Sequence, residues 1–170
     1  MKPGRNKAKG NKFENETAKQ LGSWMFNDSA ILGRHLTSGA IKTAWLGDIV
    51  PVKQLPSQFN GQFPFLFECK HGYENDVPTF IKYTKVEKWI KKCIKESELS
   101  ATQKTIYVIV KFKYKPTILI TNYLIDVNLK LFTVAIPIIN QQGTLVYFYS
   151  YLLNELFKYE FFKLFPNIYY

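Results

Sequence analysis

The chain has 170 residues, with 23 Lys and Arg against 13 Asp and Glu, and 46% of its residues are hydrophobic. This length predicts one domain, and the hydrophobic share provides a sizeable core, which excludes a disordered chain, a coiled coil and a collagen-like repeat. Two cysteines, Cys69 and Cys93, are too few for a disulfide framework, so we expect a reducing compartment. The basic start is not followed by an apolar segment, so no secretory signal is predicted and a cytoplasmic location is expected.

In chain order, residues 1–9 are polar and basic and are expected to form a flexible start to a single domain over 10–170. A helix is predicted from Gly10 to about Met25, because apolar residues recur there at helical spacing. The elements predicted after a mixed connection at 28–39 are a strand at 44–52, a loop at 54–62, an aromatic strand at 63–70, a loop at 71–78, a basic helix at 79–97, strands at 105–113 and 117–121, a β-hairpin at 131–150 and an aromatic helix at 151–165. This order predicts a mixed α/β fold in which helices pack on a small mixed sheet.

The longest uncharged run, residues 131–154, could span a bilayer by its length alone. However, Pro137 and the polar, glycine-containing segment 140–143 divide the run into two short apolar stretches. Two such stretches around a turn are typical of a β-hairpin. We therefore predict a hairpin here and no association with a membrane.

Basic charge is concentrated in two segments. Residues 1–12 carry five basic residues and no acid, and residues 82–95 carry six lysines and one glutamate, so each segment has a net charge of +5. The lysines of the second predicted helix share one face, which is the common pattern of a solvated helix. A surface of one sign also attracts a polyanion, and nucleic acid fits better than a membrane because the apolar face of this helix has no interfacial anchor pattern.

One pair of predicted strands carries candidate catalytic residues. Glu68 and Lys70 are two residues apart on an apolar strand and so point to the same side. Asp48 lies on the preceding strand, which can pair as a neighbour. Two converging carboxylates suit Mg²⁺ or Mn²⁺, and the backbone carbonyl of Cys69 can complete such a site. Phosphodiester hydrolysis needs a metal of this kind and an activated water, which Lys70 can orient. The alternative is a surface ion pair between Glu68 and Lys70.

These residues resemble the PD-(D/E)xK nuclease superfamily and, within it, the archaeal-type and phage Holliday junction resolvases. The similar segments are 9–14, Arg34, 38–39, 47–49 and 67–70, and the later strand at 115–119 also fits, so that the resemblance covers about residues 9–120. It implies a restriction-endonuclease-like core at about 10–121, followed by a C-terminal extension at about 122–170 with the hairpin and the aromatic helix.

The resemblance also implies roles for individual residues. Glu14, Asp48 and Glu68 would be the acidic metal-site residues, and Lys70 the catalytic lysine. Glu16 is the alternative to Glu14. Residues two positions apart on a helix point in roughly opposite directions, so only one of them can serve, and the spacing from Gly10 favours Glu14. Two positions depart from the family pattern, since Gly47 stands where proline is usual and Asn15 where resolvases often have arginine. The residues expected to contact DNA are Lys9, Lys12, Arg34, Ser38, His71, Lys85, Lys88 and Lys92.

From this resemblance we expect a structure-selective DNA endonuclease of the Holliday junction resolvase type, with Mg²⁺ as cofactor and Mn²⁺ as a substitute. The alternatives are another PD-(D/E)xK nuclease, acting in restriction, repair or replication, and a catalytically silent DNA-binding module of the same fold. The many aromatic residues at 147–162 include candidates for a homodimer interface, which would suit the two-fold symmetry of a junction. No phosphate-binding loop motif for a nucleotide is present. The Lys, Asn, Ile, Tyr and Phe content is typical of an AT-rich genome and consistent with a phage origin, which would place the protein in the host cytoplasm.

Overall fold

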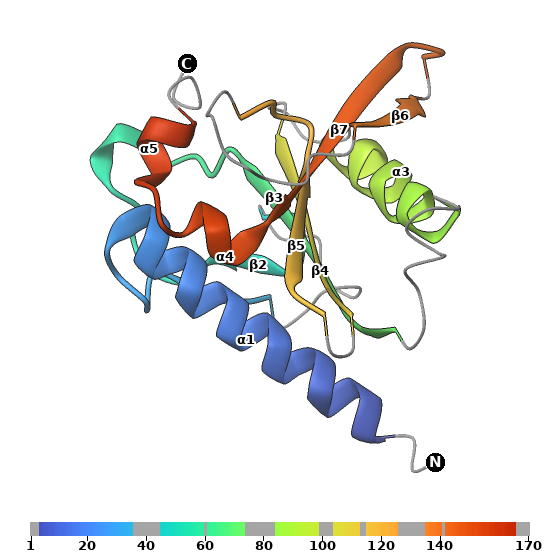
Figure 1. Ribbon diagram of the computed structural model, residues 1–170. Helices are drawn as coiled ribbons and strands as arrows, with labels where there is room; N and C mark the ends of the chain where they lie inside the picture. The colour runs from blue at the N-terminus through green and yellow to red at the C-terminus, as the bar shows by residue number, and fades with distance from the viewer. Residues whose placement is uncertain are drawn as a thin grey trace.

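The computed structural model describes residues 4–35, 45–59, 61–73, 84–98, 104–112, 115–125, 135–140 and 142–165 (Figure 1). Its centre is a seven-stranded sheet in the order β1-β2-β3-β4-β5-β7-β6. The strands are β1 (Leu32–Arg34), β2 (Ile49–Pro51), β3 (Phe65–Tyr73), β4 (Thr105–Phe112), β5 (Thr117–Thr121), β6 (Ala135–Ile139) and β7 (Leu145–Leu152). The helices are α1 (Gly4–Phe26), α3 (Thr84–Glu98), α4 (Leu153–Leu156) and α5 (Phe161–Leu164), with a 3-10 turn, η1 (Ser57–Phe59).

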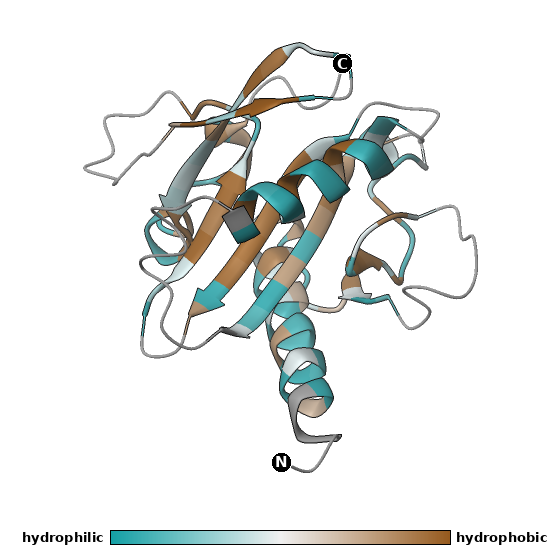
Figure 2. Ribbon diagram, turned by 90° about the vertical axis from the view of Figure 1, so that its right-hand side faces the viewer, coloured by the Kyte–Doolittle hydropathy of each residue, from teal (hydrophilic) through white to brown (hydrophobic). Residues whose placement is uncertain are grey.

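The helices lie on both faces of this sheet. Strands β3 and β4 are parallel, and the other neighbouring strands are antiparallel. A parallel pair needs a crossover connection, and α3 lies in the connection between β3 and β4. Helix α3 covers one face with its hydrophilic side outward, whereas α1, α4 and α5 cover the other (Figures 1 and 2). The predicted mixed α/β fold with helices on a small sheet is confirmed.

Strand β3 shows why the core has two halves. Its alternating side chains send Phe65, Phe67 and Cys69 into the core beneath α1, and Leu66 into the core beneath α3. The α3 side is completed by the apolar stripe of that helix, which includes Val86, a residue with no exposed surface. The strand is therefore covered on both faces, and any polar side chain on it must find a partner inside the protein.

Several boundaries differ from those predicted. Helix α1 begins at Gly4 rather than Gly10, so the described part of the expected flexible start is helical. Strand β1 lies in the segment 28–39, where only a connection was predicted; it has three residues, too few to show the alternation of a longer strand. Strand β2 begins at Ile49, later than predicted, because Gly47 has a φ of +93° that interrupts the extended chain. Strand β3 continues to Tyr73 through an irregularity after His71, where the sequence indicated a loop.

The C-terminal region also differs. The predicted hairpin is confirmed as β6 and β7, and β7 pairs with β5, so the hairpin extends the same sheet. The single aromatic helix predicted at 151–165 is wrong. Residues 151–152 end β7, because Tyr151 pairs with Leu119 of β5, and two four-residue helices follow. Among the described residues, no helix is long and apolar enough to cross a membrane.

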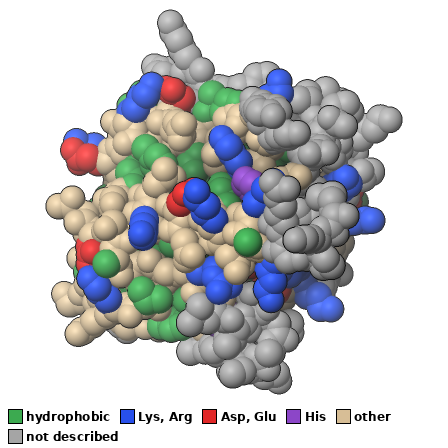
Figure 3. All heavy atoms as spheres, turned by 90° about the horizontal axis from the view of Figure 1, so that it is seen from below, with side chains coloured by type: hydrophobic (Ala, Val, Ile, Leu, Met, Phe, Trp, Pro, Cys, Tyr) green, Lys and Arg blue, Asp and Glu red, His purple; other side chains and the backbone are tan. Residues whose placement is uncertain are grey.

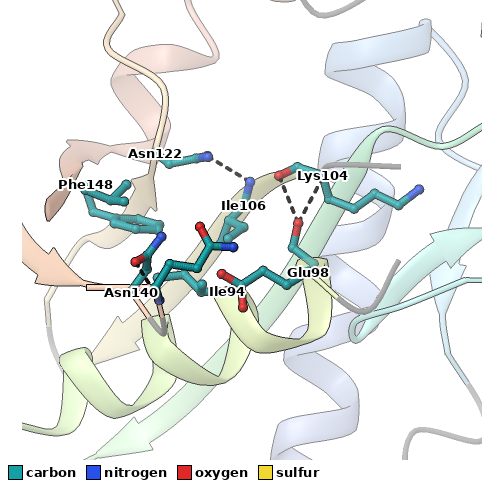
Figure 4. A pocket seen from close by; sticks show the side chains of 10 residues that line it. Ile94, Glu98, Lys104, Ile106, Asn122, Asn140 and Phe148 are labelled. Atoms are coloured by element: carbon teal, nitrogen blue, oxygen red, sulfur yellow. Dashed lines mark hydrogen bonds between the residues drawn. The ribbon is translucent and has the colours of Figure 1, made fainter. Parts of the chain in front are cut away.

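A cavity of about 430 Å³ separates the hairpin from the end of α3 (Figure 4). Ile94, Ile106 and Phe148 contribute apolar walls, and asparagine side chains line its edge. The Asn122 side-chain oxygen accepts a hydrogen bond from the Ile106 N–H at 3.0 Å, and that of Asn140 accepts one from the Gln142 N–H at 3.0 Å. These asparagines therefore stabilise the strand ends around the cavity.

Candidate active site

The position of Asp48 depends on the glycine before it. Gly47 forms a parallel bridge with Phe67 of β3, and the Asp48 N–H donates to the Phe67 carbonyl at 2.7 Å. The φ of Gly47 is +93°, and a Cβ built on it would lie 2.5 Å from the Phe67 carbonyl oxygen. Only glycine fits this close approach without displacing β3. The departure from proline at position 47 therefore has a structural reason: the backbone lies directly against β3 here and has a positive φ.

The Asp48 carboxylate is fixed against the same strand. Its Oδ2 accepts a hydrogen bond from the Cys69 N–H at 2.8 Å. Among the described residues, no hydrogen-bond donor reaches the other carboxylate oxygen, Oδ1. Burial, followed by the negative charge of Glu68, raises the pKa of Asp48, although the bond from Cys69 acts in the opposite direction. The site thus holds two carboxylates that repel one another and favour a bound cation.

Glu68 lies on the α3 side of β3 and is almost completely buried, with 1% of its side chain exposed. The ammonium of Lys70, on the same face, donates to its Oε1. The ammonium of Lys92, from α3, donates to both carboxylate oxygens at 3.0 Å each. A buried carboxylate is costly unless it is paired, and these two lysines supply the opposite charge.

Lys70 is also close to the carbonyl of Cys69, at 3.3 Å. Burial of its side chain opposes the charged form and is the largest single influence. The charge and hydrogen bond of Glu68, together with the charge of Asp48, outweigh burial, so the pKa of Lys70 is raised. Lys70 therefore remains an ammonium at neutral pH, which makes it a hydrogen-bond donor and a positive charge rather than a proton acceptor.

The two candidate glutamates of α1 differ in their surroundings. Burial, followed by the charge of Asp48, raises the pKa of Glu14, and its Oε2 is 3.9 Å from Nε of Arg34. Glu16 is 60% exposed and lies 3.8 Å from Lys12 on the same helix. Glu14 thus faces the other acidic residues, whereas Glu16 belongs to the solvated side.

The donor set fits a divalent cation that needs few protein ligands. Within the described residues, no three His, Cys, Asp or Glu side chains are arranged to hold a metal ion together. Mg²⁺, however, is commonly bound by one or two carboxylates and completed by waters and substrate phosphates. Asp48 and Glu68, with the carbonyl of Cys69, are hard oxygen donors of that kind. Glu14 lies at the edge of this set.

The described residues that are expected to contact DNA lie on α1, β1, β3 and α3. Lys9 and Lys12 are exposed on α1, and Lys85 and Lys88 are exposed on α3. Figure 3 shows a face of the molecule on which more basic than acidic side chains are visible. Arg34 and Lys92 instead make the ion pairs with glutamates described above, and Ser38 lies outside the described residues. His71 is exposed, its ring centroid is 5.1 Å from that of Phe13, and burial and the charges of Lys9 and Lys111 lower its pKa.

The contact of Lys92 with Glu68 was not predicted, because the sequence assigned Lys92 to the solvated face of α3. A signal for it was available. Glu68 alternates onto the same side of its strand as Leu66, an inner position, and an inner carboxylate requires a cation from the element that covers it. The lysine-rich helix that follows β3 is the nearest source.

The chain was compared with models of known protein families. The family model described as "Phage putative PDDEXK endonuclease" matches residues 5–159. This range extends beyond the segment 9–120 that carries the sequence resemblance and includes the β6–β7 hairpin. No curated protein and no solved structure matched the chain. Because the match covers most of the chain, and because the structure has the restriction-endonuclease-like α/β sheet, the protein belongs to this phage PDDEXK endonuclease family, which supports a nuclease of the PD-(D/E)xK type.

Proposed function

We propose that the protein is a metal-dependent endonuclease that hydrolyses phosphodiester bonds in branched DNA, as a Holliday junction resolvase. The observation that carries the proposal is the fixed position of the Asp48 carboxylate, 2.8 Å from the Cys69 N–H, beside the paired Glu68 and Lys70. Family membership supports DNA as the substrate and a divalent metal as the cofactor, and we assign Mg²⁺, with Mn²⁺ as a substitute.

The roles of the residues follow from their chemistry. Asp48, Glu68 and the Cys69 carbonyl would hold the metal, which when bound supplies a Lewis acid for the phosphate and lowers the pKa of a water. Lys70, kept as an ammonium by Glu68, orients the attacking water and stabilises negative charge on the phosphate. Glu14 adds a carboxylate on the α1 side, and Arg34, 3.9 Å away, compensates its negative charge and contacts the DNA backbone.

The proposed DNA contacts are made with phosphates. Lys9 and Lys12 lie in the N-terminal half of α1, and the first turns of this helix project beyond the sheet (Figures 1 and 2). Lys85 and Lys88 are exposed on α3, and His71 is exposed on β3. Phosphate contacts fix register and orientation but carry no base sequence. A protein that uses them would recognise DNA by shape, as cutting at a junction requires.

A homodimer would place two active sites on one junction. The outer face of the β6–β7 hairpin exposes large apolar side chains, with Ile139 60%, Leu145 51% and Tyr147 47% exposed. Exposed apolar patches of this kind mark interaction surfaces. We assign this face to a two-fold dimer interface of an enzyme that acts in the cytoplasm of the host cell. Of the late aromatic residues considered for this role, Phe148, Tyr151 and Phe161 are buried and so belong to the core.

The test is cleavage of a synthetic four-way junction beside a linear duplex and a flap of the same sequence, with Mg²⁺ or with EDTA. The variant is Asp48→Asn, which keeps the shape of the side chain and removes its charge. Glu160→Gln is the control, because Glu160 is 73% exposed and pairs only with Lys163 among the described residues. We expect paired, symmetric nicks in the junction, which disappear with EDTA and with Asp48→Asn but persist with Glu160→Gln.

Other outcomes separate the alternatives. If the protein cuts all three substrates, it is a nuclease that is not selective for junctions. Tight junction binding without cleavage in Mg²⁺ or Mn²⁺ would replace the enzyme with a DNA-binding module. The mass of the protein in solution tests the dimer, which Tyr147→Glu should dissociate.

A further inference from the structure

Lys92 occupies an unusual place among the lysines of α3. Its Nζ is equidistant from the two oxygens of Glu68, at 3.0 Å from each, and thus faces the carboxylate as a bidentate partner. The Lys92 side chain is 52% exposed, whereas that of Glu68 is 1% exposed. Lys92 therefore reaches from the solvent side of α3 to a buried carboxylate.

The positions around this ion pair leave little room for another cation. A carboxylate offers about four lone-pair sites. Lys92 uses one on each oxygen, and Lys70 uses one on Oε1. A divalent ion bound to Glu68 would share an oxygen with the Lys92 ammonium, and the two positive charges would repel each other.

Lys92 also has an alternative acidic partner. Glu96 lies one turn further along α3, and its Oε1 is 3.5 Å from the Lys92 Nζ. A lysine side chain is flexible, so the ammonium can move toward Glu96 or toward a DNA phosphate without any change in the backbone. Lys70 has less freedom, since its side chain is only 19% exposed and its ammonium also lies against the Cys69 carbonyl.

We infer that Lys92 competes with the divalent metal for Glu68: it compensates the buried carboxylate when no metal is bound and withdraws when a metal binds. It is a positioning residue that sets the metal affinity of the site. This inference rests on the proposed metal-dependent function, because it assumes that Glu68 is a metal ligand.

The direction in which metal affinity changes when Lys92 is removed distinguishes competition with the metal from two simpler roles. If Lys92 competes with the metal, its removal strengthens metal binding. If Lys92 instead holds Glu68 in the geometry that the metal needs, its removal weakens metal binding. If Lys92 serves only as a phosphate contact, its removal changes DNA affinity and leaves metal affinity unchanged.

The experiment is a calorimetric titration of the protein with Mn²⁺ in the absence of DNA. The variant is Lys92→Met, which keeps the length and apolar stem of the side chain. The matched control is Lys91→Met, because Lys91 is the adjacent residue of α3, is 51% exposed and pairs with Glu87 at 2.7 Å, also one turn away. We expect about three- to tenfold tighter Mn²⁺ binding for Lys92→Met, since a half-exposed ion pair contributes only modestly, and no change beyond about twofold for Lys91→Met.

Two further variants identify the cause. Lys92→Arg keeps the positive charge and should restore the weaker affinity of the wild type. Glu68→Gln should abolish the difference between Lys92 and Lys92→Met, because the shared ligand is gone. A circular dichroism spectrum of each variant checks that the fold is retained.

The inference is overturned if Lys92→Met binds Mn²⁺ more weakly than the wild type or the same as Lys91→Met. It is also overturned if neither the wild type nor Lys92→Met binds Mn²⁺ at all. Because the titration contains no DNA, its result is independent of cleavage. If Lys92→Met shows the expected change in Mn²⁺ affinity but the wild type cuts no DNA, the competition between Lys92 and the metal stands and the proposed nuclease function fails. If the wild type cuts DNA but Lys92→Met does not change the Mn²⁺ affinity, the nuclease function stands and the competition fails.

Discussion

Replacement of Gly47 by alanine tests whether the close approach of the chain to β3 positions the candidate site. The new Cβ would lie 2.5 Å from the Phe67 carbonyl oxygen and 3.1 Å from its nitrogen, both backbone atoms that cannot rotate away. The backbone at position 47 must therefore move, and with it Asp48. Two hydrogen bonds would be strained or lost, from the Asp48 N–H to the Phe67 carbonyl at 2.7 Å and from the Cys69 N–H to Asp48 Oδ2 at 2.8 Å.

The magnitude follows from these parts. A left-handed backbone costs an L-residue about 1–2 kcal/mol, and each lost hydrogen bond costs about 1 kcal/mol. We expect Gly47→Ala to reduce the free energy of unfolding by about 2–4 kcal/mol and the melting temperature by about 5–15 °C. Junction cleavage should fall to background at temperatures where the variant is still folded. Urea unfolding followed by circular dichroism, with a cleavage assay at low temperature, measures both effects.

Gly143→Ala is the matched control. Gly143 has a φ of +77°, but a Cβ built there meets nothing within 4 Å. It should therefore lose only about 1–2 kcal/mol for its left-handed backbone and keep full activity. If Gly47→Ala loses no more stability than Gly143→Ala and cleaves DNA at the wild-type rate, then the position of Asp48 does not depend on the bridge to Phe67.

Two other predictions concern the charge of the site and the C-terminal core. The pKa of Asp48 is raised in the folded protein, so the folded state binds the Asp48 proton more tightly than the unfolded state does. This proton contributes its full stabilisation at pH values below the pKa of Asp48 in the unfolded state. The stabilisation is lost as the pH rises through the pKa of Asp48 in the folded state. In the absence of metal, Asp48→Asn should therefore have a higher melting temperature than the wild type at neutral pH, and the difference in melting temperature should be smaller at about pH 4. Thermal unfolding in the presence of EDTA measures this difference. A difference that stays constant across this pH range would contradict the raised pKa of Asp48. Phe161→Ala should lose about 3–5 kcal/mol, because Phe161 is 2% exposed and its ring contacts Trp24 at 4.9 Å between centroids. The neighbouring Phe162, which is 37% exposed, should lose far less on the same change, and equal losses in urea unfolding would show that α5 does not pack as described.

The sequence predicted most of the central sheet because its strands have strong local signals. The aromatic alternation before Glu68, and the apolar runs that became β4, β5 and the hairpin, all lie where they were expected. Strands β1 and β2 have three residues each, and such short elements are defined by pairing with their neighbours rather than by their own pattern. The end of β7 is a similar case, because its pairing with β5 keeps Tyr151 extended in a segment whose spacing favours a helix.

In the candidate site, too, some contacts were predictable from local sequence patterns and others depend on tertiary packing. The spacing of Glu68 and Lys70 on one strand placed them together, and the link to Asp48 followed from pairing of adjacent strands. The spacing from Gly10 already favoured Glu14 over Glu16. The rotation of α1 against the sheet, which turns Glu14 toward Asp48, depends on packing of its buried residues Leu21 and Met25. The contact between Lys92 and Glu68 joins segments 24 residues apart, and it depends on where α3 crosses β3.

That crossing is itself a consequence of topology. Strands β3 and β4 are parallel neighbours, so the chain between them must cross one face of the sheet, and α3 lies on the face that contains Leu66 and Glu68. In the proposed enzyme, the metal ligand Glu68 on this face is removed from water by the same helix that completes the core. The helix must then supply a cation for the periods when no metal is bound, and a lysine at the border between its apolar stripe and solvent can do so while remaining free to leave. Lys92, half-exposed and paired with both Glu68 and Glu96, meets these requirements, and the basic face of α3 accordingly serves the buried carboxylate as well as any DNA bound outside it.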